Sequence, residues 1–151
     1  MLDAVTEAMR PYRGKWQFLT KPRNPMKIII ETIPHEQHRY TTVGDWFYDS
    51  DGTLHIKVSA LSDKRREWLI ALHELVEVLT CEHDGITQKQ VDDFDMAYKG
   101  DDEPGDDSDA PYREQHCLAT GIERILAARW GVDWKKYEDE LFDLPEIPVK
   151  T

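Results

Sequence analysis

The sequence predicts an α+β protein in which a small antiparallel sheet precedes a cluster of helices. Three observations support this class: β-branched and aromatic residues gather before Leu61, helical patterns fill most of the remainder, and one helical stretch carries a His-Glu-x-x-Glu motif. Strands followed by helices, rather than alternating with them, are typical of α+β folds. The length of 151 residues suits a single domain with its own core, spanning residues 1–151.

Strand patterns occupy the region before the first long helix. Residues 27–33 (KIIIETI) are rich in β-branched side chains and stop at Pro34. Residues 39–48 form one strand or two short ones, and residues 49–52 (DSDG) are a strong turn signal. Residues 53–59 (TLHIKVS) alternate between apolar and polar side chains and are expected to be the return strand, with one apolar face made of Leu54, Ile56 and Val58.

The N-terminal region carries weaker patterns. Residues 2–10 are expected to form a short helix, and residues 11–26 an irregular arm interrupted by glycine and proline. Three histidines in or next to the strand region are expected to be exposed: His35, His38 and His55.

Helical patterns follow the strands. The longest expected helix spans residues 62–82, with Ser62 as its N-cap and Gly85 beyond its end. Other helices are expected at residues 88–98, 111–130 and 134–142. Apolar residues at helical spacing predict the buried sides of the two long helices: Leu69, Leu72, Val76 and Leu79 on the first, and Leu118, Ile122, Ile125 and Leu126 on the second.

The charge of the chain is strongly negative and unevenly distributed. The net charge is −11 at pH 7, so the overall field does not attract nucleic acid. Residues 99–110 (KGDDEPGDDSDA), here called the acidic loop, are expected to be a flexible loop without regular secondary structure. They lack the spacing and closing glutamate of an EF-hand, so no calcium site is predicted.

Composition also bears on location. The N-terminus lacks the apolar region of a signal peptide, and no apolar run approaches membrane-spanning length. The two cysteines, Cys81 and Cys117, have no disulfide-framework spacing. We therefore expect a cytoplasmic protein, in the host cytosol if the chain is viral, with no membrane partner.

The motif in the long helix contains residue types that bind metal ions. His73 and Glu77 are four positions apart and face the same way on a helix, while Glu74 lies at the edge of that face. An imidazole and a carboxylate one turn apart can bind one metal ion, and a neighbouring carboxylate can take a proton from water. His116 on the later helix is a candidate third ligand. The alternative interpretation is a solvated polar face on a core helix.

These segments resemble a known family. The strand end IKVSALS, the helix REWLIALHELVE and the later run REQHCLATGIERILA look like the zincin-like metallopeptidases of the ImmA/IrrE group, over about residues 27–130. That resemblance would also suit a phage-encoded protein. In that family the first helix supplies two histidines and the later helix an acid. Here the first helix has His73 and Glu77 and the later helix has His116, so two positions are exchanged while the ligand set stays two histidines and one glutamate.

The resemblance implies a zincin-like fold and a zinc-dependent peptidase that acts on one specific protein. His73, Glu77 and His116 would bind Zn²⁺, and Glu74 would be the general base. Glu123 is expected to be a further ligand, to orient His116 or to form a surface ion pair, and Tyr112 either supports the transition state or packs against its neighbours.

Two other functions remain open from the sequence. A zincin-like scaffold that has lost activity would be an interaction or structural module, in a phage or in a regulatory circuit. All-α nucleotide pyrophosphohydrolases bind Mg²⁺ through helical carboxylate pairs, and Asp92, Asp93 and Asp95 would then complement Glu74 and Glu77. The strands before the long helix count against this second alternative.

Overall fold

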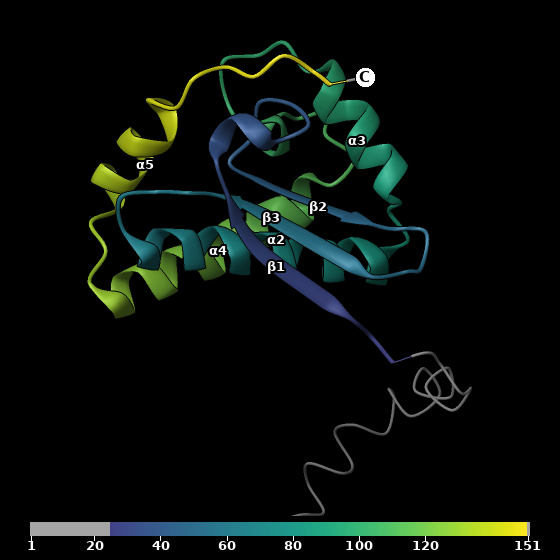
Figure 1. The fold of residues 1–151 in the computed structure, drawn as a ribbon, viewed down its shortest axis with the longest axis horizontal. Coiled ribbons are helices and arrows are strands. Elements are labelled where there is room, and N and C mark those ends of the chain that lie inside the picture. Colours follow the sequence, from purple (N-terminus) through teal and green to yellow (C-terminus); the bar gives the residue numbers. More distant parts are fainter. Residues whose placement is uncertain (1–24, 151) are drawn as a thin grey trace, which may run out of the picture.

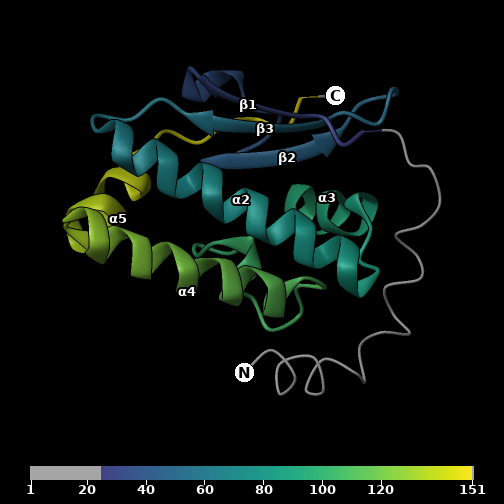
Figure 2. The ribbon, with the colours of Figure 1, turned by 90° about the horizontal axis from the view of Figure 1, so that it is seen from below.

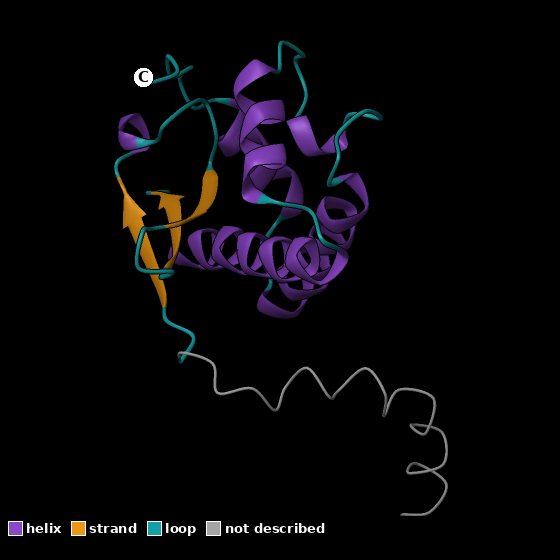
Figure 3. Cartoon of the chain, turned by 90° about the vertical axis from the view of Figure 1, so that its right-hand side faces the viewer, coloured by secondary structure: helices purple, strands orange, loops and turns teal. Residues whose placement is uncertain are grey.

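The computed structural model describes residues 25–150, which stack in three layers. A sheet forms the first layer, α2 (Lys64–Asp84) the second and α4 (Arg113–Trp130) the third (Figure 2). Figure 3 shows the strands gathered to one side of the helices. The predicted α+β class is confirmed, whereas the expected N-terminal helix and nearly all of the expected arm lie outside the described residues.

The sheet is mixed, so the predicted antiparallel sheet is correct only in part. Its strands are β1 (Ile28–Ile33), β2 (Gly44–Tyr48) and β3 (Leu54–Ser59), in the order β1-β3-β2 (Figure 1). The predicted hairpin of β2 and β3 is antiparallel, but β1 runs parallel to β3. Residues 34–43 connect β1 to β2 across two strand spacings, about 9–10 Å, which leaves room for β3 between them.

The central strand β3 supplies the core beneath α2. Leu54, Ile56 and Val58 share one face as predicted, and each is at most 1% exposed. They form one hydrophobic cluster with residues of α2, including Leu69 and Val78. Because β2 is paired in register with β3, Gly44 and Trp46 lie opposite Val58 and Ile56 and therefore face α2 as well.

Local signals set the helix ends within two residues of the prediction. Helix α2 begins after Asp63, whose side chain accepts a hydrogen bond from the Arg65 backbone N–H, so the N-cap is not Ser62. Gly85 and Gly131 end α2 and α4 in the left-handed conformation that glycine adopts most readily.

The shorter helices lie at the two ends of α2 and α4. They are α3 (Gln88–Ala97) and α5 (Trp134–Phe142) (Figure 1). Among the described helices, none has the length and hydrophobicity needed to cross a membrane.

The long helices bury the sides predicted for them only in part, since Leu69 is fully buried as expected but other members of the two apolar stripes are exposed. Leu79, Leu118 and Ile125 are 39%, 50% and 70% exposed, whereas His73 and Glu123 are buried. The reason is that α4 covers the polar side of α2, where imidazoles and carboxylates hydrogen-bond one another across the interface. The apolar pattern alone could not reveal this pairing.

Two further expectations are corrected. His35 and His38 are buried, and both bond to the Ser59 hydroxyl, at 2.9 and 3.0 Å; His55 is half-buried rather than exposed. The acidic loop contains a short 3-10 helix, Pro104–Asp106, although no secondary structure was expected there.

Candidate metal centre

Helix α2 brings the first two predicted ligands together. His73 and Glu77 follow one another by one turn on the side facing α4, and both are buried. The His73 Nε2 atom lies 3.5 Å from the Glu77 Oε2 atom. Both atoms therefore face one point between the two helices.

Helix α4 adds His116 to the same point. Its Nδ1 atom lies 3.1 Å from His73 Nε2 and 3.1 Å from Glu77 Oε2. The three atoms form a nearly equilateral triangle. Zinc ligands at about 2.0–2.1 Å in a tetrahedral arrangement stand about 3.3–3.4 Å from one another. The donor set and its spacing thus fit a zinc ion, as His73, Glu77 and His116 together could bind a metal.

Other side chains fix the orientation of these ligands. The Glu123 Oε2 atom lies 2.9 Å from His73 Nδ1, so it accepts the proton of that nitrogen and leaves Nε2 free as a ligand. The Tyr137 hydroxyl donates to the other oxygen of Glu123. The Trp46 indole donates to Glu77 Oε1 at 3.0 Å, which leaves Oε2 for the metal. Glu123 therefore bonds to His73, whereas one of the predicted roles had paired it with His116.

Trp46 and Tyr137 were not predicted as site residues. Both look like ordinary core aromatics in the sequence, and both are buried. Their polar atoms reach Glu77 and Glu123 only because β2 and α5 pack against α2 and α4. The sequence could predict, from strand alternation, which side of β2 carries Trp46. It could not predict that the indole bonds to Glu77.

Glu74 occupies a separate position beside the triangle. A Cβ atom added to Gly44 would collide with the Glu74 Oε1 atom, so this carboxyl lies against the backbone of β2. Within the described part of the chain, no hydrogen bond to this carboxyl is present. Burial, reinforced by the negative charge of Glu77, raises the pKa of Glu74 well above its usual value. A raised pKa favours the protonated form of this carboxyl over the charged form.

The candidate ligands differ from Glu74, because their surroundings favour the charged form of each side chain. Burial acts against the charged imidazole of His73, but its hydrogen bonds to Glu123 and Glu77 outweigh burial and raise its pKa. Hydrogen bonds from His116 and His73 likewise overcome burial and lower the pKa of Glu77. The site stabilises positive charge at this point, and a cation would replace the protons on binding.

The site opens into a cavity of about 750 Å³. His73, Glu74, Glu77 and His116 line it together with the β2 backbone around Gly44. Residues 100–106 of the acidic loop line another wall. A substrate that enters this cavity would meet the edge of the sheet, Glu74 and the ligand triangle together.

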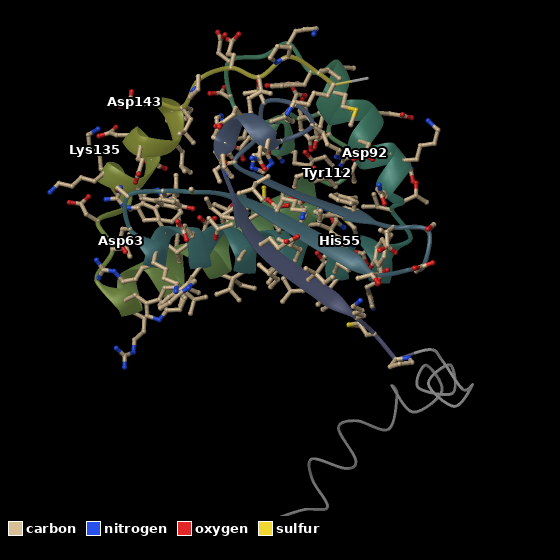
Figure 4. The ribbon with its side chains drawn as sticks, viewed as in Figure 1. His55, Asp63, Asp92, Tyr112, Lys135 and Asp143 are labelled. Carbon is tan, nitrogen blue, oxygen red and sulfur yellow. The ribbon has the colours of Figure 1, made fainter. Side chains whose placement is uncertain are left out.

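Tyr112, labelled in Figure 4, lies near the site but has another partner. Its ring packs edge-on against His116 with centroids 6.3 Å apart, and its hydroxyl donates to Asp95 at 2.5 Å. The geometry therefore gives Tyr112 a packing role beside His116.

Removing the carboxylate behind His73 is expected to weaken metal binding. Glu123→Ala leaves His73 Nδ1 without its acceptor, and loss of such outer partners typically costs 10–100-fold in metal affinity, so about that loss is expected. Zinc affinity measured by competition with a chromogenic chelator checks it. Asp139→Ala, at an exposed position of α5, is the control and should leave the affinity unchanged. An unchanged affinity for Glu123→Ala would show that His73 does not need this partner.

The similarity to zincin-like peptidases remains a prediction from short motifs. Comparison of the chain with protein-family models, with curated proteins and with solved structures gave no match.

Proposed function

We propose that this protein is a zinc-dependent peptidase that hydrolyses a peptide bond in a specific protein substrate. The observation that carries the proposal is the triangle of His73 Nε2, Glu77 Oε2 and His116 Nδ1 with sides of 3.1–3.5 Å. Two imidazoles and one carboxylate are the ligand set of catalytic zinc sites. A bound zinc ion supplies Lewis-acid polarisation of a carbonyl group and lowers the pKa of water.

Glu74 would carry the protons of the reaction. Its carboxylate accepts a proton from the water that attacks the carbonyl carbon, and later gives that proton to the departing amine nitrogen as the C–N bond breaks. Its raised pKa helps the group to hold the proton between the two steps. The products are a new carboxylate and a new amine.

The sheet edge next to Glu74 suits an extended polypeptide. Strand β3 is paired on both sides, and β2 is one of the two edge strands of the described sheet, the one that lies beside Glu74. Residues 41–46 of this edge line the cavity. A substrate added alongside β2 would pass its backbone over Glu74, and this mode of recognition uses main-chain hydrogen bonds.

The observations favour this function over the two alternatives. An inactive module has no need for the unbonded carboxyl of Glu74 beside a ligand triangle. A magnesium-dependent pyrophosphohydrolase would need free carboxylates on a partner helix, but Asp92 is bonded by Arg39 at 2.9 Å, and Asp95 accepts bonds from Tyr112 and Tyr40 at 2.5 and 3.2 Å.

Elemental analysis of protein purified without a metal-affinity tag tests the proposal. We expect about one zinc per chain. Zinc at a hundred times its dissociation constant adds about 2.7 kcal/mol of stability, so chelation should lower the melting temperature by roughly 5–11 °C. Protein that stays metal-free after zinc is offered, with an unchanged melting temperature, would contradict the proposal.

A further inference from the structure

The two imidazoles of the candidate metal centre are flanked differently on their outer edges. His73 has Glu123 at 2.9 Å from Nδ1. His116 has two carboxylates of the acidic loop near its outer nitrogen: Nε2 lies 3.3 Å from Glu103 Oε2 and 3.5 Å from Asp106 Oδ1. Glu103 thus lies near the outer nitrogen of His116, as Glu123 lies near the outer nitrogen of His73.

The outer nitrogen of His116 needs such a partner. The residue is only 6% exposed, and Nε2 is a buried atom without a well-aligned hydrogen bond to any described residue. When Nδ1 donates its lone pair to a metal, Nε2 carries the ring proton, and a buried N–H without an acceptor is costly. Glu103 is the nearest carboxylate that can accept it.

The backbone of the acidic loop is seated directly on the same ring. Gly105 is buried, and a Cβ atom added to it would collide with the Cγ and Nδ1 atoms of His116. No side chain fits between the loop and the ring. The position of residues 103–106 and the orientation of the imidazole therefore depend on each other.

We propose that Glu103 is a positioning residue that holds His116 in its metal-binding tautomer, and that metal binding thereby fixes the acidic loop against the cavity. This inference rests on the proposed metal site and adds that metal binding controls the position of the acidic loop. Residues 100–106 form one wall of the cavity, so the shape of the substrate site becomes conditional on the metal. Metal-free protein would present a less ordered wall and bind substrate less well.

Variants of the acidic loop test the role of Glu103. Glu103→Ala should lower zinc affinity about 10–100-fold, the usual cost of losing an outer partner. Glu103→Gln keeps an oxygen acceptor and should recover part of that loss. The matched controls are Asp101→Ala and Asp101→Asn, because Asp101 is exposed in the same loop and forms no ion pair within the described residues. Both controls should bind zinc as the wild type does.

A general effect of negative charge would behave differently. It would lower zinc affinity equally in Glu103→Gln and Glu103→Ala, since each removes the same charge at the same position. That result would overturn the positioning role. The absorption spectrum of the Co²⁺-substituted protein gives a second readout, because a misoriented His116 changes the ligand field, and Glu103→Ala should alter it while Asp101→Ala should not.

Hydrogen exchange tests the coupling to the acidic loop. In the wild type, zinc should slow exchange of the amides in residues 99–110, and in Glu103→Ala this protection should be lost even at saturating zinc. Protection that is equal in both proteins would refute the coupling. Two metal ions per chain, with the second lost in Glu103→Ala and Asp106→Ala, would also overturn it, because these carboxylates and His116 would then bind a second cation.

The outcomes separate this inference from the proposed function. Wild-type protein with one zinc, together with identical behaviour of Glu103→Ala and Asp101→Ala, refutes the inference and leaves the peptidase proposal intact. Wild-type protein that binds no zinc refutes both.

Discussion

Replacing Glu74 by glutamine is expected to leave zinc bound and to reduce peptide hydrolysis by roughly 10²–10⁴-fold, the usual contribution of a general base. The amide of the new side chain would keep the shape of the original against Gly44 but could not accept a proton from water. The ligand triangle does not involve Glu74, so zinc content should remain that of the wild type.

The measurement of hydrolysis does not require a known substrate. Zinc-loaded wild type and Glu74→Gln are each incubated with a peptide library from a proteome digest, and new amino termini are identified by mass spectrometry. New termini should appear with the wild type only. Glu82→Gln makes the same chemical change on the same helix, at a surface carboxylate bonded to Tyr48, and should behave as the wild type does. Loss of zinc from Glu74→Gln would instead place Glu74 among the ligands.

Replacing His116 by alanine is expected to release the metal. The change removes one of the three donor atoms, so α4 no longer supplies a ligand. Zinc affinity should therefore fall by more than the roughly 100-fold loss typical of an outer partner. The melting temperature of the variant should no longer rise on zinc addition, because stabilisation by a ligand requires binding to the folded state. His83→Ala, at an exposed histidine of α2, is the matched control.

The fold of the variant must be checked in the same experiment. His116 contacts Glu77, Glu103 and His73, so its removal takes one hydrogen-bond partner from the buried carboxylate of Glu77. His116→Asn keeps a polar group at the position and should also lose the metal while its circular dichroism remains that of the wild type. Unchanged zinc content in both variants would show that the third ligand is another residue.

Much of the local structure was determined by the sequence itself. Strand alternation placed Leu54, Ile56 and Val58 on one buried face, and glycines at positions 85 and 131 ended the long helices as expected. These features depend on neighbours in the chain, through side-chain alternation and backbone conformation. The helical spacing of His73 and Glu77 belongs to the same class, because one turn of helix sets it.

The packing of the helices was decided only in three dimensions. The apolar residues Leu118 and Ile125 were expected to be buried, but α4 turns its polar side toward α2. A helix with both an apolar and a polar stripe can bury either one, provided that the buried polar atoms find partners, and those partners lie on α2, about forty or more residues earlier. The antiparallel direction predicted for β1 was wrong for a similar reason, since a connection of this length allows β1 to pair with either strand of the hairpin.

The environment of the candidate site also depended on tertiary contacts. The sequence marked His73, Glu74, Glu77 and His116 as residues of suitable chemistry. Only the tertiary structure assigned Glu123 to His73, brought the Trp46 indole to Glu77 and seated Glu103 beside His116. Hydrogen bonds act over about 3 Å in space, and sequence periodicity records only the distance along one element. The chemistry of the ligands could therefore be read from the chain, but the contacts that orient them required the assembled layers.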